Sequence, residues 1–273
     1  MKFWKKAILT FALILPVFVL AACGKSASST KNTTVKVGIM STDKEIWTDI
    51  QSRLKKQGVT IKLVQFTDYN QPNQALEDGD IQLNAFQHHN FLDNWNKKNH
   101  GTLISAGNVH LEPIAVYSKK YKSLKDLPKG AKIYVSSNTA DYGRILKIFK
   151  DAGLITLKKG TKLASANFDD IKTNKKHLKF VHTFEAKLMP KLYESNEAAA
   201  TVINANYAVQ AGLNPSKDSI ARESDSSDYA NLIAIRKDEK NNKAIKKLVK
   251  ALQSKSTQKW IKKHFKGAVL PAK

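Results

Sequence analysis

Strands and helices alternate along this 273-residue chain, and this alternation limits the possible folds more than any other feature of the sequence. Apolar residues at every second position predict strands at 35–39, 61–66 and 81–85. Helical spacing of apolar residues predicts helices at 44–57, 71–77 and 89–98. The alternation is typical of an α/β domain with a largely parallel sheet.

The same alternation begins again after residues 119–122. There the expected elements are helix 124–127, strand 132–135, helix 139–152, strands 179–181 and 200–203, helix 204–211, strand 232–235, and helices 242–253 and 257–264. Two α/β units in tandem predict two lobes, with a cleft between them where a small ligand binds. We place the first lobe at 35–117, with 230–273 returning to it, and the second lobe at 118–229.

The N-terminus predicts export and lipidation. Three lysines in the first six residues precede an apolar run at 7–22, which is shorter than the about 20 residues of a membrane span. This pattern is typical of a signal peptide, which we place at 1–22. The run ends in Leu-Ala-Ala-Cys-Gly, so we expect the sole cysteine, Cys23, to carry a thioether-linked diacylglycerol. The alternative is a short N-terminal anchor helix with an incidental cysteine.

The segment 23–34 is rich in Ser, Thr and Lys, which predicts a flexible tether between the lipid and the folded domain. The expected location is therefore the extracytoplasmic face of the cell membrane. The net charge of +23 raises the question of nucleic-acid binding. Only four residues are arginines and the lysines are spread along the chain, so we predict a solvated basic surface and no nucleic-acid partner. An envelope-binding module that uses this surface is a further alternative.

No motif for catalysis or for a cofactor occurs in the chain. The sequence has neither a glycine-rich phosphate loop nor a G-x-S-x-G elbow, so we predict that it is not an enzyme. A divalent-metal site is the main rival hypothesis, since His88, His110 and Glu112 are suitable ligands. Neither a His-x-x-x-His pair nor a His-rich loop supports it.

Other residues suit a free amino acid. Arg144 falls in the first turns of a predicted helix that Asn138 or Thr139 can cap, where it can hold a carboxylate. The alternative is a surface arginine that pairs with Asp141. Three further residues lie at the ends of predicted strands, the edge at which α/β sheets bind ligands, although core packing also explains them: Tyr69, Phe86 and His88.

Several motifs together resemble one known family. They are F-T-D-Y-x-Q-P-N at 66–73, G-D-I at 79–81, N-A-F-Q-H at 84–88, G-N-V-H-L-E-P at 107–113, Y-S-K-K-Y-K-S-L at 117–124, G-R at 143–144, A-G-L-I at 152–155, I-N-A-N-Y-A at 203–208, S-x-Y-A-N at 227–231 and F-K-G-A-V at 265–269. In this set the chain resembles the methionine-binding lipoproteins of methionine ABC importers, the NlpA/MetQ family. The resemblance covers essentially the whole domain after the tether.

The resemblance implies a two-lobed periplasmic-binding-protein fold that delivers its ligand to an ABC permease and its ATPase, most simply as a monomer. The implied ligand is L-methionine, a methionine derivative or a methionine-containing dipeptide. By position, Arg144 would hold the ligand carboxylate, and Asn204 and Asn231 would bond its backbone. The implied side-chain pocket is formed by Tyr69, Phe86 and His88. Asn138 is a further candidate ligand contact, and Glu112 would either bind the ammonium or have a structural role.

Three stretches depart from the family pattern. The family has a small-residue loop where this chain has 41–45, and it has N-D-P-[ST]-N where this chain reads Ser-Asn-Thr-Ala-Asp at 137–141. Asn90-Phe91 stands in place of Pro-Tyr. These changes leave the expected site for the ligand carboxylate intact. They affect the residues expected to select the side chain of the ligand.

Overall fold

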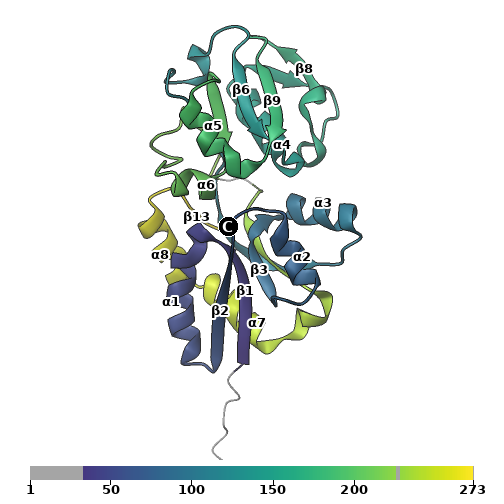
Figure 1. The fold of residues 1–273 in the computed structure, drawn as a ribbon, viewed down its shortest axis with the longest axis vertical. Helices are drawn as coiled ribbons and strands as arrows, with labels where there is room; N and C mark the ends of the chain where they lie inside the picture. The colour runs from purple at the N-terminus through teal and green to yellow at the C-terminus, as the bar shows by residue number, and fades with distance from the viewer. Residues whose placement is uncertain (1–32, 226–227, 273) are drawn as a thin grey trace, which may run out of the picture. The chain divides into compact units, whose positions relative to one another are not determined.

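The computed structural model describes residues 33–225 and 228–272. The predicted signal peptide, Cys23 and most of the predicted tether lie outside the described residues. Residues 32–273 form one compact unit, and its strands form two principal sheets. Figure 1 shows these sheets in two lobes of that unit, with α6 between them.

The first sheet has six strands in the order β13-β4-β12-β3-β1-β2. Their bounds are β1 Thr33–Met40, β2 Val59–Phe66, β3 Leu83–His88, β4 Ile104–Leu111, β12 Asn231–Ile235 and β13 Leu270–Pro271. Strand β12 lies between β3 and β4, so the chain returns to this sheet near its end. The helices of this lobe are α1 Lys44–Lys55, α2 Gln71–Glu77, α3 His89–Asn99, α7 Lys243–Leu252 and α8 Lys255–Phe265.

The second sheet has five strands in the order β11-β5-β10-β6-β9. Their bounds are β5 Ala115–Tyr117, β6 Lys132–Ser136, β9 Lys179–Phe184, β10 Ala200–Ile203 and β11 Ala221–Arg222. A separate hairpin joins β7 Ile155–Leu157 to β8 Ile171–Asn174. The helices of this part of the chain are α4 Tyr142–Asp151, α5 Met189–Ser195 and α6 Ala205–Gln210. The chain passes between the two sheets at residues 112–114 and again between β11 and β12.

The expectation of largely parallel sheets is wrong. Strands β1, β2 and β3 pair in parallel, as do β6, β9 and β10. Strands β12, β13, β5 and β11 pair antiparallel with their neighbours. The difference arises where the chain crosses from one sheet to the other, because a strand that enters from the opposite lobe runs against the βα units already in place.

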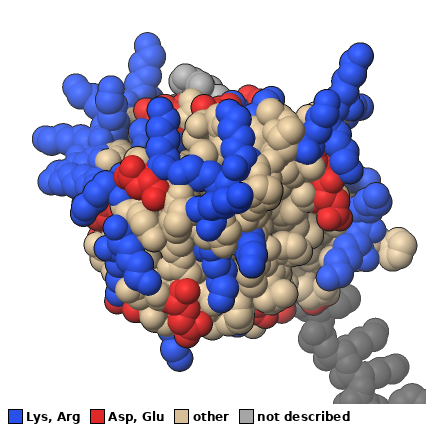
Figure 2. Space-filling view, turned by 90° about the horizontal axis from the view of Figure 1, so that it is seen from above, with Lys and Arg blue, Asp and Glu red and all other residues tan. Residues whose placement is uncertain are grey.

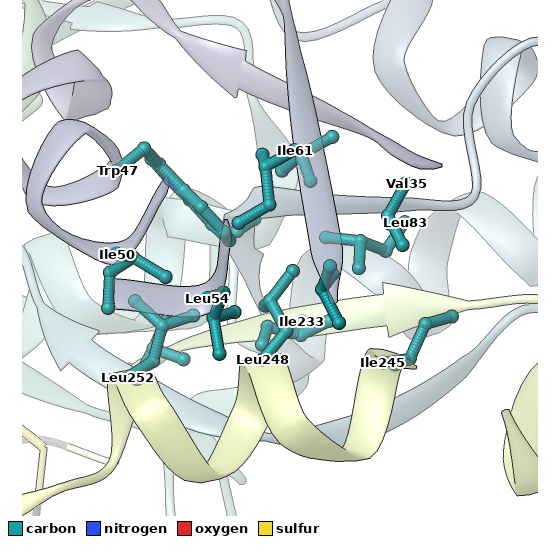
Figure 3. Close-up of a cluster of buried hydrophobic side chains, with 14 of the residues drawn as sticks. Val35, Trp47, Ile50, Leu54, Ile61, Leu83, Ile233, Ile245, Leu248 and Leu252 are labelled. Atoms are coloured by element: carbon teal, nitrogen blue, oxygen red, sulfur yellow. The ribbon is translucent and has the colours of Figure 1, made fainter. Parts of the chain in front are cut away.

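A separate buried cluster stabilises each sheet. In the first lobe, one face of α1 and one face of α7 pack on the strands, and Figure 3 shows Trp47, Ile50 and Leu54 of α1 meeting Leu248 and Leu252 of α7. In the second lobe, α4 buries Ile145, Leu146 and Phe149 against its own sheet. The predicted helices of the first lobe are confirmed, α2 with the expected bounds. None of the described helices has the length and apolarity that crossing a membrane requires.

Candidate ligand-binding site

The two lobes meet around a cavity of about 20 Å³. The first lobe contributes residues from the C-terminal ends of β2, β3 and β4 and from the start of β12, and the second contributes residues from the starts of α4 and α6. All eight residues predicted to contact the ligand line this cavity: Tyr69, Phe86, His88, Glu112, Asn138, Arg144, Asn204 and Asn231. Gln87, Phe91, Asp141 and Ala205 complete the lining.

Asp141 is the centre of the polar contacts in this site. Its side chain is completely buried, and it ends the single turn of 3-10 helix Thr139–Asp141 that leads into α4. Its Oδ2 accepts hydrogen bonds from Nδ2 of Asn138 at 2.7 Å and Nδ2 of Asn204 at 2.9 Å. Its Oδ1 accepts one from Nε2 of His88 at 3.0 Å. One carboxylate therefore connects the second lobe to the first.

These contacts keep Asp141 ionised in spite of its burial. Burial by itself raises the pKa of a carboxyl, because the charged form loses its water. Here the hydrogen bond from His88, the charge of Arg144 and the bond from Asn204 outweigh burial and lower the pKa of Asp141 to about 2. The site thus contains a fixed negative charge at neutral pH.

His88 is held by the helix that follows it. It is the N-cap of α3, and its Nδ1 accepts a hydrogen bond from the backbone N–H of Phe91 at 3.3 Å. Because Nδ1 accepts, the proton is on Nε2, which donates to Asp141. The cap therefore fixes both the tautomer of His88 and the direction of its bond across the cleft.

Arg144 is buried, with 4 % of its surface exposed, and it is already paired. Its Nε donates to Oε1 of Glu223 at 3.1 Å, and its Nη2 bonds Oε2 of the same carboxylate and the backbone oxygen of Glu112. Its Nη1 lies 3.5 Å from Oδ1 of Asp141, so the alternative pairing considered from the sequence is present as well. The ring of Tyr229 covers the guanidinium at 5.0 Å. Burial lowers the pKa of Arg144, but the charges of Glu223 and Asp141 and the bond to Glu223 together outweigh it and raise that pKa.

Glu223 lies where the chain crosses between the sheets. The N–H of Ile114 donates to Oε2 of Glu223 at 3.3 Å, and the backbone N–H of Glu223 donates to the oxygen of Ile114 at 3.0 Å. Arg144 therefore contacts both crossings, one through the carboxylate of Glu223 and one through the carbonyl of Glu112. Its orientation depends on how these two segments lie together.

Aromatic rings form the apolar wall of the site. The rings of Phe86 and Phe91 meet edge to face at 5.4 Å, and Tyr69 lies 5.8 Å from Phe86 and 5.2 Å from Tyr207. The hydroxyl of Tyr69 donates to Oδ1 of Asn206 at 2.6 Å, which is a second bond between the lobes. Such rings suit an apolar or sulfur-containing side chain, since sulfur–ring contacts contribute about 0.3–1.5 kcal/mol.

Buried amides hold the strand end that carries Phe86 and His88. Nε2 of Gln87, between them, donates to Oδ1 of Asn73 and of Asn84, and Nδ2 of Asn73 donates back to Gln87 at 2.8 Å. Nδ2 of Asn84 also donates to the backbone oxygen of Pro72. A fully bonded buried network of this kind is rigid, so it fixes β3 against α2.

The residues of the metal hypothesis separate into two groups. His88 bonds Asp141, whereas His110 bonds Glu112 at 3.1 Å and lies 3.9 Å from Asp43. Burial and the neighbouring charge of Glu112 raise the pKa of Asp43 well above its usual value. For Glu112, burial raises the pKa, but the bond and charge of His110, together with Asp43 and the charge of Arg144, lower it more. His110 and Glu112 of the predicted metal set therefore lie with Asp43, whereas His88 bonds Asp141.

A wider cavity of about 470 Å³ adjoins the site. The two cavities share Tyr69, Phe91 and Asn138, and the wider one continues along α3 to Trp95 and Lys98. It gives the inner cavity a route to the surface between the lobes.

Five residues of this site are not among those that the sequence predicts: Gln87, Phe91, Asp141, Ala205 and Glu223. Asp141 was considered only as an ion-pair partner, although a carboxylate three residues before a buried arginine on one helix face is a usable signal. Glu223 follows Arg144 by 79 residues, and no local pattern connects them. Asn138 caps the turn that leads into α4, as the sequence predicts, and the side chain of Asn204 bonds Asp141.

The model of one family, described as NlpA lipoprotein, matches residues 35–273. The chain belongs to the NlpA lipoprotein family. It is 42% identical over 271 residues to the methionine-binding lipoprotein MetQ of Bacillus subtilis, with 98% of each chain covered. A structure of a pheromone cOB1 precursor/lipoprotein of the YaeC family from Enterococcus faecalis is 49% identical with a TM-score of 0.85, covering 88% of this chain and 100% of that one. A nutrient binding protein from Burkholderia cenocepacia bound to methionine is 43% identical with a TM-score of 0.81 and the same coverage.

Membership of the NlpA family confirms the resemblance seen in the sequence and the two-lobed periplasmic-binding-protein fold. The family consists of lipoproteins that bind a substrate and are not enzymes, so the prediction of a non-enzymatic binding protein is confirmed as well. The roles of individual site residues stay predictions.

Proposed function

We propose that this chain is the extracytoplasmic substrate-binding lipoprotein of an ABC importer and that its ligand is L-methionine or a close relative. The observation that carries the proposal is the cavity that brings together all eight residues expected to contact such a ligand. The similar proteins described as methionine-binding or as bound to methionine support the ligand. A similar chain from Coxiella burnetii, described as the periplasmic substrate-binding protein of an ABC transporter, supports the partner.

The charges of the site suit both ends of an amino acid. Arg144 receives the ligand carboxylate at Nη1, the guanidinium nitrogen that has no bond to Glu223. Asp141 and Oδ1 of Asn204, a buried oxygen with no hydrogen-bond partner among the described residues, receive the ammonium. Asn231, at the start of β12 with 4 % of its surface exposed, bonds the backbone of the ligand. The aromatic wall contacts the side chain, whether of methionine, a methionine derivative or a methionine-containing dipeptide.

Ligand capture in this proposal works by movement of the lobes. The first lobe supplies Tyr69 and His88 and the second supplies Arg144 and Asn204, so the ligand touches both sets only when the cleft is closed. The crossings act as hinges, at 112–114 and at the described residues 223–225 and 228–230. The predicted lobe division stays a prediction, with its boundary moved from residue 117 to 112–114 because β5 belongs to the second sheet. Lipidation of Cys23, a monomeric state and docking on the permease are parts of the same proposal.

Mass spectrometry tests the ligand. The domain from residue 28 onward is measured in native and then denaturing conditions to identify the molecule released, and the stripped protein is then titrated with L-methionine. We expect about one methionine per chain and tight rebinding. Arg144→Ala should abolish rebinding because the carboxylate loses its cation, while Lys147→Ala, on the exposed side of the same helix, should leave it unchanged.

Two results would contradict the proposal. One is a folded Arg144→Ala protein, checked by circular dichroism, that binds methionine as the wild type does. The other is a stripped wild type that binds no methionine, methionine derivative or methionine dipeptide. If Arg144→Ala does not fold, Asn204→Ala serves in its place, because its side chain contributes no helix cap.

A further inference from the structure

The positive charge of the chain is concentrated on one short segment. Residues 236–266, which contain α7 and α8, hold twelve Lys and Arg against two acidic residues, a net charge of +10 out of +23. Residues 33–117 of the same lobe hold eight basic and nine acidic residues, a net charge of −1. The basic segment is therefore a local feature and not a consequence of overall composition.

The lysines of this segment lie on one side of each helix. In α7 they recur at helical spacing (243, 246, 247 and 250), opposite the buried Ile245, Leu248 and Leu252 that Figure 3 shows packed toward the sheet. In α8 and just after it they recur in the same way (255, 259, 262, 263 and 266), opposite the buried Ile261. With Lys237 and Lys240, these eleven exposed lysines form what we call the basic face.

Carboxylates of the protein do not neutralise this face. In residues 33–225 and 228–272, none of its eleven lysines forms an ion pair, although Lys119, Lys147 and Lys187 elsewhere do. The second lobe is different. Figure 2 shows acidic side chains among the lysines at its end, and residues 118–229 hold twelve acidic residues against twenty basic ones. Like charges placed together repel each other, so this local excess of positive charge favours an anionic partner.

The position of the basic face near the entry of the chain from Cys23 favours a membrane as the anionic partner. Strand β1 begins at Thr33, whose N–H donates to the oxygen of Gly58, and Nζ of Lys247 donates to the oxygen of the adjacent Gln57 at 3.0 Å. The chain that arrives from Cys23 thus enters the domain beside α7. The ten residues from 24 to 33 span at most about 35 Å when extended. A lipid on Cys23 would keep Thr33, and with it the part of α7 around Lys247, within that reach of the bilayer.

We propose that the basic face of α7 and α8 docks on anionic lipid headgroups and holds the first lobe against the membrane surface. Lysine side chains are suited to this task, because clustered lysines next to an anchor attract acidic phospholipids. A diacylglycerol on Cys23 has two acyl chains and would hold the chain on the membrane by itself, so the basic face would orient the first lobe on the surface.

The test uses residues 32–273, since every buried cluster lies within this unit and an attached lipid would mask the effect. Co-sedimentation is measured with vesicles of phosphatidylcholine alone and with 30% phosphatidylglycerol. The variant replaces Lys243, Lys250, Lys259 and Lys263 by Gln, all exposed. The matched control replaces the same number of exposed lysines on the second lobe: Lys158, Lys159, Lys172 and Lys175.

We expect binding only to the anionic vesicles, weakened at least tenfold when salt rises from 0.1 M to 0.5 M, because exposed charges are screened. The α7/α8 variant should bind at least tenfold more weakly than the wild type, and the control variant within threefold of it. Equal losses in both variants would mean that net charge alone attracts the protein, and would overturn the proposal. So would binding to a soluble glycerol-phosphate polymer, through the same lysines, without binding to the vesicles.

Discussion

Replacing Asp141 by Asn tests how one buried charge holds the lobes together. The substitution keeps the shape of the side chain and removes its charge. The amide nitrogen of Asn takes the place of one carboxylate oxygen. At the position of Oδ2 it faces the N–H donors of Asn138 and Asn204, and at the position of Oδ1 it faces Nε2 of His88. At least one of these donors then loses its acceptor, and Arg144 loses one of its two nearby carboxylates.

The size of the effect follows from the pKa of Asp141. Its fall from 3.8 to about 2 means that the folded protein favours the ionised form. At about 1.4 kcal/mol for each pKa unit, this amounts to about 2–3 kcal/mol of stability at neutral pH. Because the folded pKa lies below the unfolded one, this contribution is present above pH 4 and is lost as the pH falls toward 2.

Urea unfolding of wild type and Asp141→Asn, each measured from pH 7 down to pH 3, supplies the comparison. We expect the variant to be less stable by about 2–3 kcal/mol at pH 7, with an unchanged dependence on urea concentration, and the gap to narrow at the acid end. A difference below about 0.5 kcal/mol at pH 7, or one that stays constant with pH, would refute the account of Asp141 as a buried ionised hub.

Three further predictions concern neighbouring residues. Asn at position 43 mimics the protonated form of Asp43. In the wild type the raised pKa of Asp43 lowers the free energy of unfolding as the pH increases above about 4, and Asp43→Asn should remove this fall. Urea unfolding across pH 4–8 measures it, and an unchanged dependence of the unfolding free energy on pH would contradict the prediction. Glu223→Gln should lower stability by about 2–4 kcal/mol, since it leaves the buried guanidinium of Arg144 less well paired. It should also raise the affinity for methionine, because one carboxylate that competes for Arg144 is gone. Calorimetry measures the affinity, and weaker binding would show that Glu223 chiefly orients Arg144. Gly143→Ala would place a methyl group 1.8 Å from the backbone oxygen of Leu163, so we expect a loss of at least about 2 kcal/mol by thermal unfolding, whereas an unaltered melting temperature would show that residues 163–165 move aside freely.

The sequence is sufficient for the elements that have a strong apolar period. Residues 71–77 and 200–203 are predicted with the bounds that the structure has, and helix 89–98 differs by one residue. The hairpin of β7 and β8 is missed because its strands have three and four residues, mostly polar or exposed, and so carry no period. Strand β4 is missed although it has eight residues, since Ser105, Gly107 and Asn108 interrupt its apolar pattern.

The site shows the same division between local and long-range information. Seven of the eight predicted site residues lie in short motifs, and Asn138 lies in the stretch that departs from the family pattern. The motifs locate the strand ends and helix starts that surround the cavity. The pairing of these residues is set by chain crossings that no motif encodes. Arg144 was therefore predicted as a cation available to a ligand, and the structure pairs it with Glu223 from the second crossing.

This pairing links ligand binding to the arrangement of the lobes. Arg144 contacts Glu112 and Glu223 on the two crossings, while Asp141, three residues before it, bonds His88 of the first lobe. A rotation about the crossings must stretch the bond between Asp141 and His88, and that between Tyr69 and Asn206, before it alters the pocket walls. A ligand that bonds Arg144 and Asp141 together strengthens the arrangement in which those cross-lobe bonds are short. Its binding energy is therefore available to keep the cleft closed, which is what delivery to a membrane importer requires.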